Sequence, residues 1–194
     1  MKIRTVRRRL AAAAIATVAA TGTVAATAAG AHAATLPNYS VSQGQTPYWI
    51  AAATTYMAMS VADASSDNYH RVVQWYNTGG DEQKWYFDGV TDATTNTYVG
   101  FMLRNKNSGK CLATDGAAGD TLFQLPCNPY IYGIIWNNKV DYNVNNIPLY
   151  WRYTNRDTGL KLDVSGNSYS AGANLDLWYD NSQGNQAFLL TATS

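Results

Sequence analysis

The stretch that decides the fold reads VVQWYNTGGDEQKW and runs from residue 72 to residue 85. Much of its pattern returns as NLDLWYDNSQGNQAF at residues 174–188. When the two stretches are aligned on Trp75 and Trp178, both have Gln eight residues later and an aromatic residue ten residues later. This agreement predicts that the two stretches occupy the same place in two copies of one structural unit.

A third, more divergent copy lies between them, at residues 122–136. The aromatic residues that close the three copies are 51 and 52 residues apart, and they are Trp85, Trp136 and Phe188. A short run of alternating apolar residues comes before each copy, at residues 56–61, 109–114 and 159–164. The chain is therefore expected to contain three repeats of about 50 residues each.

The segments between these markers are typical of short β-strands. No segment sustains an apolar stripe with the 3.6-residue period of a helix over ten or more positions, and clusters of Gly, Asn, Asp and Ser separate the apolar runs. One repeat of four short strands cannot bury its own apolar face, whereas three repeats that close on each other can, and closure removes exposed sheet edges. The sequence therefore predicts an all-β barrel with three-fold pseudosymmetry.

Residues 1–33 have the pattern of an export signal. Five Lys and Arg residues and no acidic residue precede a run of Ala, Val, Ile and Thr, and Ala31-His32-Ala33 supplies small residues at positions −3 and −1. A membrane anchor is the alternative, but a run made mostly of Ala and Thr is weakly apolar for a span of about 20 residues. We expect cleavage after Ala33 and an extracellular protein, with the Sec and twin-arginine routes both open.

Loss of this signal changes the charge of the chain. It removes five of the 14 Lys and Arg residues and none of the 13 Asp and Glu residues, which leaves a net charge of about −4. Nucleic acid and anionic membranes attract basic surfaces, so neither is an expected partner of the mature protein. Two cysteines, Cys111 and Cys127, remain, and in an exported protein an even number predicts a disulfide, which contributes about 3 kcal/mol on the chain-entropy estimate.

The repeats resemble the ricin B-chain type lectin family, whose members are β-trefoil carbohydrate-binding modules. Gln83-Lys84-Trp85 and Gln186-Ala187-Phe188 are similar to the Gln-x-Trp element of that family. The resemblance covers residues 50–194, which we expect to form the lectin-like domain. The signal peptide at 1–33 and an N-terminal arm at 34–49 come before this domain. It implies a β-trefoil with three pseudo-repeats, and the family often places an intra-repeat disulfide where the two cysteines lie.

The sugar site of the family uses an Asp after a Leu, an aromatic platform and an Asn before the Gln. A carboxylate accepts strong hydrogen bonds from sugar hydroxyls, an indole packs against the C–H face of the ring, and an amide both donates and accepts. In the last repeat the resemblance implies a complete carbohydrate-binding set, in which Gln186 orients the other side chains from behind. The set consists of Asp163, Asp176, Trp178, Asn185 and Gln186.

The first and middle repeats depart from this pattern. The first keeps Trp75 and Gln83 but has Ser60 where the last repeat has Asp163, so only a weak site is expected, with Asp63 as a substitute carboxylate. The middle repeat has Ala113 at that position, and we interpret this repeat as structural.

We therefore expect a monomeric, secreted, non-catalytic protein that binds galactose-type or xylan-type sugars mainly through the last repeat, with no cofactor or metal. One alternative is a small glycoside hydrolase, which needs two carboxylates such as Asp163 and Asp176. Another is a protein-binding trefoil, such as a protease inhibitor, that presents a rigid loop at residues 143–148. The Asp163, Trp178 and Asn185 set favours sugar binding over both alternatives. The natural sugar and the role of the N-terminal arm are left open.

Overall fold

The computed structural model describes residues 37–144 and 147–193, and six of the strands in this part of the chain form a barrel. These strands are β2 (Tyr48–Ala52), β5 (Lys84–Asp92), β6 (Thr97–Asn105), β9 (Trp136–Val144), β10 (Ile147–Asn155) and β13 (Phe188–Ala192). The antiparallel pairs β2–β5, β5–β6, β6–β9, β9–β10, β10–β13 and β13–β2 form a closed ring. The predicted barrel is confirmed. The expected signal, residues 1–33, lies outside the described residues.

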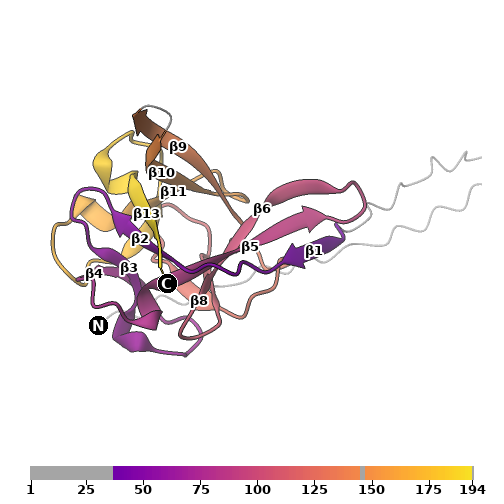
Figure 1. The fold of residues 1–194 in the computed structure, drawn as a ribbon, viewed down its shortest axis with the longest axis horizontal. Helices are drawn as coiled ribbons and strands as arrows, with labels where there is room; N and C mark the ends of the chain where they lie inside the picture. The colour runs from indigo at the N-terminus through magenta and orange to yellow at the C-terminus, as the bar shows by residue number, and fades with distance from the viewer. Residues whose placement is uncertain (1–36, 145–146, 194) are drawn as a thin grey trace, which may run out of the picture. The chain divides into compact units, whose positions relative to one another are not determined.

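Each repeat adds one short hairpin to the barrel. The hairpins are β3 (Ala58–Val61) with β4 (Val72–Trp75), β7 (Cys111–Ala113) with β8 (Phe123–Leu125), and β11 (Lys161–Val164) with β12 (Leu175–Trp178). Single β-bridges connect every hairpin to the other two: Arg71 to Phe123, Thr121 to Asp176, and Val73 to Asn174. Three four-strand repeats joined in this way form the β-trefoil that the repeats predicted (Figure 1).

Short 3₁₀ turns follow the same symmetry in the first and third repeats. The turns η1 (Ala62–Ala64) and η3 (Ser165–Asn167) follow β3 and β11, and η2 (Asp81–Gln83) and η4 (Gly184–Gln186) precede β5 and β13. None of the helices in the described part of the chain has the length and apolar character needed to cross a membrane.

The strand register places equivalent residues of the three repeats at the same point of their hairpins. Asp163 is opposite Asp176 in β11–β12, Ser60 is opposite Val73 in β3–β4, and Ala113 is opposite Phe123 in β7–β8. Likewise Trp178, Trp75 and Leu125 stand at the same end of their hairpins, opposite Lys161, Ala58 and Cys111. The alignment of the repeats by sequence spacing therefore agrees with the structure.

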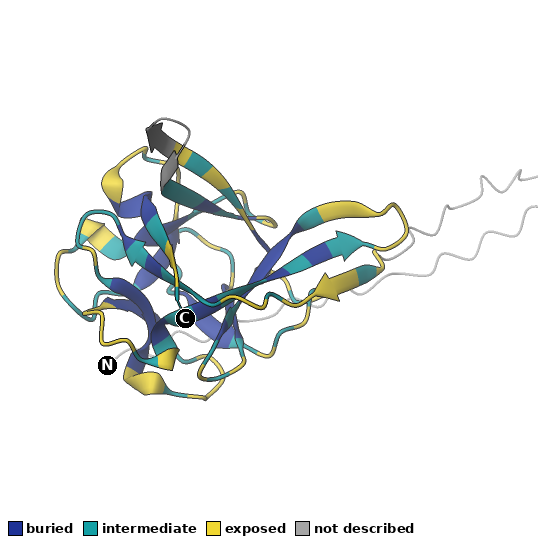
Figure 2. Ribbon diagram, in the orientation of Figure 1, coloured by how far each residue is buried: buried dark blue, intermediate teal, exposed yellow. Residues whose placement is uncertain are grey.

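The barrel encloses an apolar core, which Figure 2 shows as buried segments on the inner strands. Trp85, Trp136 and Phe188 are at most 1% exposed and belong to one cluster, as the spacing of the repeats predicted. The indole N–H of Trp85 donates to the Met59 carbonyl at 2.9 Å, and that of Trp136 donates to the Leu112 carbonyl at 3.1 Å. These two bonds tie a barrel strand to the hairpin of its own repeat.

The expected N-terminal arm, residues 34–49, contributes strand structure where it is described. Strand β1 (Tyr39–Ser42) pairs antiparallel with the distal half of β5, and Figure 1 shows it beside the β5–β6 hairpin. The Gly44 N–H donates to Asp88 Oδ1 at 2.9 Å, and Arg104 Nε donates to Asp88 Oδ2 at 2.7 Å. The partly buried Asp88–Arg104 ion pair therefore helps to fasten the arm to the barrel, and β2 begins at Tyr48.

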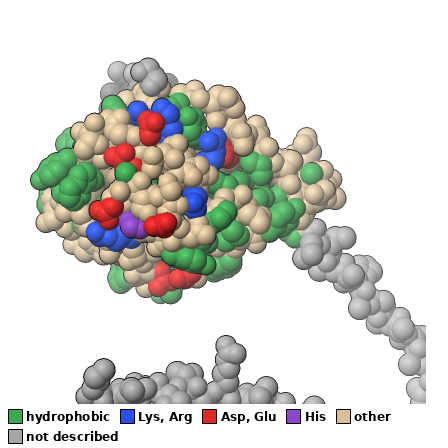
Figure 3. All heavy atoms as spheres, turned by 90° about the horizontal axis from the view of Figure 1, so that it is seen from below, with side chains coloured by type: hydrophobic (Ala, Val, Ile, Leu, Met, Phe, Trp, Pro, Cys, Tyr) green, Lys and Arg blue, Asp and Glu red, His purple; other side chains and the backbone are tan. Residues whose placement is uncertain are grey.

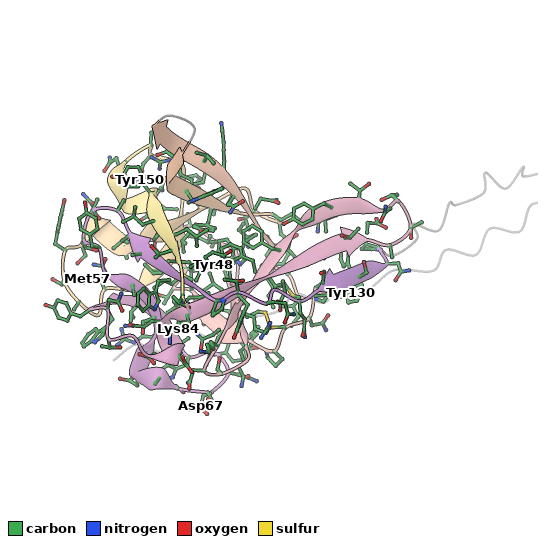
Figure 4. The ribbon with its side chains drawn as sticks, viewed as in Figure 1. Tyr48, Met57, Asp67, Lys84, Tyr130 and Tyr150 are labelled. Carbon is green, nitrogen blue, oxygen red and sulfur yellow. A yellow bond between two sulfur atoms is a disulfide. The ribbon has the colours of Figure 1, made fainter. Side chains whose placement is uncertain are left out.

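The predicted disulfide is present between Cys111 in β7 and Cys127, just after β8. The segment that follows Cys127 leads to Tyr130, which Figure 4 labels beside β1. The Tyr130 hydroxyl accepts a hydrogen bond of 3.1 Å from the Tyr39 N–H, and the two rings are 5.3 Å apart. The long loop of the middle repeat is thus held by the disulfide at Cys127 and by the arm at Tyr130.

Candidate functional site

The third repeat carries an open pocket of about 460 Å³. The pocket is lined by Asp163, Ser165, Gly166, Asn167, Asp176, Trp178, Asn181, Gln183, Asn185 and Gly119. Of the five carbohydrate-binding residues predicted in this repeat, four line the pocket, and the fifth, Gln186, is fully buried behind it. The structure therefore brings the predicted residues together in one place.

Asp163 is held at the back of the pocket by two amide side chains. Asn185 Nδ2 donates to Oδ1 and Oδ2 of Asp163 at 2.9 and 2.8 Å, and Gln186 Nε2 donates to Oδ2 at 2.8 Å. Gln186 also donates to the Tyr179 carbonyl at 2.8 Å, which fixes its amide. Burial raises the pKa of Asp163, and the two amide hydrogen bonds oppose that rise. The carboxylate is therefore locked in one orientation.

Asp176 is the cross-strand neighbour of Asp163 and is bonded differently. It is 6% exposed, and its Oδ1 has no hydrogen-bond partner. Burial, together with the negative charge of Asp163, raises the pKa of Asp176 to about 6, although a hydrogen bond from Ser165 opposes the change. A buried, unpartnered carboxylate oxygen is costly to leave in a folded protein, so a ligand group that donates to it gains an unusually strong contact.

Trp178 forms the aromatic wall. Its side chain is 44% exposed, and its ring meets the Tyr179 ring edge-on with 6.0 Å between centroids. Gly119, from the middle repeat, lies against the indole: a Cβ at this position would be 3.5 Å from Trp178 Cζ3. The Gly119 N–H donates to the Leu177 carbonyl at 2.7 Å, and its φ of +89° favours glycine. The exposed indole face is therefore available to a flat apolar surface.

A smaller pocket of about 240 Å³ occupies the same place in the first repeat. Trp75 is its platform, 43% exposed, and Gly172 of the third repeat takes the place that Gly119 has at Trp178. Ser60 and Val73 stand where the third repeat has its two carboxylates. The first-repeat pocket therefore has the aromatic side chain but lacks the two carboxylates of the third-repeat pocket.

The two remaining residues of the predicted weak site have other roles. Gln83 Nε2 donates to the Tyr76 carbonyl at 2.8 Å and its Oε1 accepts from the Thr78 N–H at 2.9 Å, so it braces a turn. Asp63 lies at the rim of the pocket in η1, with φ +55° and its side chain 80% exposed, 3.4 Å from His70 Nε2. It occupies the position of Gly166, three residues after the carboxylate position, which is why it is not buried in the pocket.

The middle repeat has filled the equivalent space. Tyr69, with φ +61°, takes the place of Gly119 and Gly172, and its ring packs 5.2 Å from Phe123. The Tyr132 ring lies so close to Gly116 that a Cβ there would be 2.6 Å from Tyr132 Cε1. Ala113 and Leu125 stand where the third repeat has Asp163 and Trp178, so the middle repeat lacks the carboxylate and the indole.

The sequence did not predict that a glycine from a different repeat lies against the Trp of each pocket. The signal was present, because Gly119 and Gly172 both stand three residues before the Leu that starts the apolar run of their hairpin, Leu122 and Leu175. The loop at residues 143–148, weighed as a protein-binding element, includes residues 145 and 146, which lie outside the described residues.

Residues 38–125 match the family described as ricin-type beta-trefoil lectin domain-like. This match confirms the resemblance drawn from the repeats. No curated protein matches the chain.

Solved structures share the fold. ThreeFoil, a designed three-fold symmetric protein, has a TM-score of 0.63 and 24% identity over 75% of this chain and 97% of its own. The exo-β-1,3-galactanase 1,3Gal43A of Clostridium thermocellum has a TM-score of 0.66 and 24% identity over 77% of this chain and 30% of its own. The Macrolepiota procera ricin B-like lectin, solved with lactose, has a TM-score of 0.60 and 20% identity over 79% of this chain and 99% of its own.

Proposed function

We propose that this chain, which matches the ricin-type β-trefoil lectin domain-like family over residues 38–125, is a secreted carbohydrate-binding protein whose main site is the third-repeat pocket. One observation carries the proposal. Asp163, fixed by Asn185 and Gln186, stands beside the half-exposed indole of Trp178 in one open pocket. The proposal is further supported by the lactose complex of the Macrolepiota procera lectin, which has the same fold.

The pocket offers the two kinds of contact that a sugar needs. The C–H face of a pyranose ring packs on the Trp178 indole, while Asp163 accepts hydrogen bonds from hydroxyls on the ring edge. The amides of Asn185 and Gln186 fix the carboxylate before the sugar arrives, so little conformational entropy is lost when the sugar binds. Galactose-type and xylan-type sugars are the proposed ligands, on the strength of the family resemblance.

We propose binding without chemical change to the sugar. A glycosidase places its acid and its nucleophile or base on either side of the scissile bond. Asp163 and Asp176 are opposite each other in adjacent strands and line the same wall, so both face a bound sugar from one side. Incubation with a panel of chromogenic glycosides tests this point, and release of the chromophore by pure protein would contradict it.

The charge on one face of the molecule does not favour a polyanionic partner. Acidic and basic side chains are interspersed on the face seen in Figure 3, so this face carries no large field of one sign. Export is part of the proposal, and it is tested by the intact mass of protein collected from culture medium. Cleavage after Ala33 gives a chain that begins at Ala34, whereas a full-length mass would contradict secretion through a cleaved signal.

The central test is a glycan array followed by calorimetry with the best ligand. We expect Asp163→Ala to abolish sugar binding, because each charge-assisted hydrogen bond contributes about 1.5–3 kcal/mol and a millimolar site has only about 4 kcal/mol in total. Ser60→Ala, at the equivalent position of the first repeat, is the matched control and should leave binding unchanged. Circular dichroism checks that both variants fold. A folded Asp163→Ala protein with unaltered affinity would contradict the assignment.

A further inference from the structure

The third-repeat pocket differs from an ordinary neutral-sugar site in having two carboxylates in its back wall. Asp163 and Asp176 are direct cross-strand partners, 3% and 6% exposed. Side chains at such positions lie close together on one face of a hairpin, and like charges there repel each other. Burial raises the pKa of both carboxyls, and at Asp176 the negative charge of Asp163 adds to the rise.

The second carboxylate is not needed for the fold. Its position is taken by Val73 in the first repeat and by Phe123 in the middle repeat, and both hairpins form with the same register. An apolar residue at position 176 would therefore satisfy the trefoil and avoid the cost of burying a charge. This cost is present only in the repeat that also has the complete binding set.

No cation in the described structure neutralises the pair. None of the described residues that line the pocket is Lys, Arg or His. On β11, Lys161 lies 3.7 Å from Asp180 and donates to Thr154, and on β10, Arg152 is paired with Asp141 at 2.8 Å. The neighbouring loop of the middle repeat adds only acidic groups, Asp115 and Asp120.

The hydrogen bonds of the pair are also incomplete. Asp163 receives three amide contacts, whereas Asp176, which also lines the pocket, has no donor to its buried Oδ1. A sugar hydroxyl supplies one neutral donor. A primary ammonium supplies three donors and a positive charge, and a half-exposed indole such as Trp178 attracts cations to its face.

We propose that the third-repeat pocket prefers a sugar that carries a free primary ammonium group, namely a hexosamine unit, over its neutral or N-acetylated counterpart. The ammonium donates to Asp176 Oδ1 and is attracted by both carboxylates, while the sugar ring lies on Trp178. This inference rests on the proposed function, because it assigns a ligand class to the same pocket.

The preference should depend on pH in a defined direction. The pKa of Asp176 is about 6, so its side chain is largely neutral at pH 5 and charged at pH 7. The ammonium is charged at both values, and its advantage therefore grows as the pH rises from 5 to 7. A bound cation lowers the pKa of Asp176, so binding near pH 6 should release protons, which calorimetry in two buffers of different ionisation enthalpy detects.

The experiment titrates purified protein with galactosamine, galactose and N-acetylgalactosamine, and with the same three forms of glucose. At pH 7 we expect the amine to bind about tenfold more tightly than the neutral sugar, the usual difference between a charge-assisted and a neutral hydrogen bond. At pH 5 most of that difference should be lost. N-acetylgalactosamine keeps a substituent at the same carbon without the charge, and it should not share the advantage.

Two variants test whether Asp176 itself causes the preference for the amine. Asp176→Asn keeps the shape of the side chain and should remove the amine preference while neutral sugars still bind. Asp180→Asn removes a nearby, largely exposed carboxylate outside the pocket and should leave the preference intact. Two results would overturn this inference: equal affinity for amine and neutral sugar in the unaltered protein, or an amine preference that survives in Asp176→Asn. Either result leaves the proposed function standing. If neither the six sugars nor a xylo-oligosaccharide binds at either pH, the proposed function itself fails. The pH profile of the unaltered protein tests the inference even if a variant does not fold.

Discussion

At the scale of single residues, the neighbouring carboxylates of Asp163 and Asp176 differ in how fully they are hydrogen-bonded. Asp163 receives three amide contacts from Asn185 and Gln186, while Asp176 keeps one oxygen without a partner. The spacing of the sequence predicted the first group, because Asp163, Asn185 and Gln186 stand at fixed distances from Trp178 within one repeat. It could not predict the unpartnered oxygen of Asp176, because the hydrogen bonds of a side chain depend on the tertiary contacts around it.

Removal of the Asp176 charge should stabilise the protein in a pH-dependent way. The folded-state pKa of about 6 is above the ordinary value of 3.8, so the folded protein holds a proton that the unfolded chain releases between these two values. Stability from this group is therefore fully present below pH 4 and is lost as the pH rises to about 6. We expect Asp176→Asn to raise the free energy of unfolding by about 1–3 kcal/mol at pH 7 and by little at pH 4.

Urea unfolding at the two pH values measures this difference. Asp180→Asn is the control, because a hydrogen bond from the Ser182 backbone lowers the pKa of Asp180 and its charge is favourable in the folded state. An Asp176→Asn protein that is equally destabilised at both pH values would mean that the carboxylate stabilises the fold.

At the scale of elements, each binding pocket is built by two repeats. Strand β12 supplies Trp178, and the loop before β8 supplies Gly119, which closes the pocket with a backbone hydrogen bond to Leu177. The same arrangement joins Trp75 to Gly172. Sequence comparison of the repeats predicted four short strands in each repeat, but contacts between the hairpins of different repeats are set by the closure of the barrel and are not visible within one repeat.

The paired glycines allow a matched test. Gly119→Ala and Gly172→Ala both place a Cβ on a residue with positive φ, +89° and +85°, so each should lower stability by about 1 kcal/mol. Only Gly119→Ala should weaken sugar binding, because its methyl group enters the third-repeat pocket beside Trp178. Calorimetry and thermal unfolding of the two variants provide the comparison. If Gly172→Ala loses binding and Gly119→Ala does not, the main site lies in the first repeat.

At the scale of the whole molecule, the three-fold architecture follows from the spacing of three aromatic residues. The 51- and 52-residue intervals between Trp85, Trp136 and Phe188 predicted one shared core, and the structure has all three in one buried cluster. The pairing of β1 with β5 lay outside that reasoning, because the arm has no counterpart in the repeats. Besides the strand pairing, the arm is held by Asp88, which accepts from the Gly44 N–H and pairs with Arg104, and both residues are far from Gly44 in the sequence.

Truncation of a core aromatic should therefore affect the whole fold. Trp136 is fully buried and its indole N–H is bonded to Leu112, so Trp136→Ala should lower the free energy of unfolding by about 3–5 kcal/mol. Chemical denaturation measures the change. A loss below about 1 kcal/mol would contradict a single cooperative core, which deletion of a buried Trp should disturb strongly.

The proposed function depends on the third repeat being the site of sugar binding. Trp178 and Trp75 hold equivalent positions and are almost equally exposed, at 44% and 43%, so truncation of either should disturb the fold to the same small degree. The most direct measurement is the sugar affinity of Trp178→Ala and Trp75→Ala, by calorimetry with the best array ligand. We predict that Trp178→Ala loses binding and that Trp75→Ala keeps the affinity of the unaltered protein. Retention of full affinity by folded Trp178→Ala would contradict this prediction.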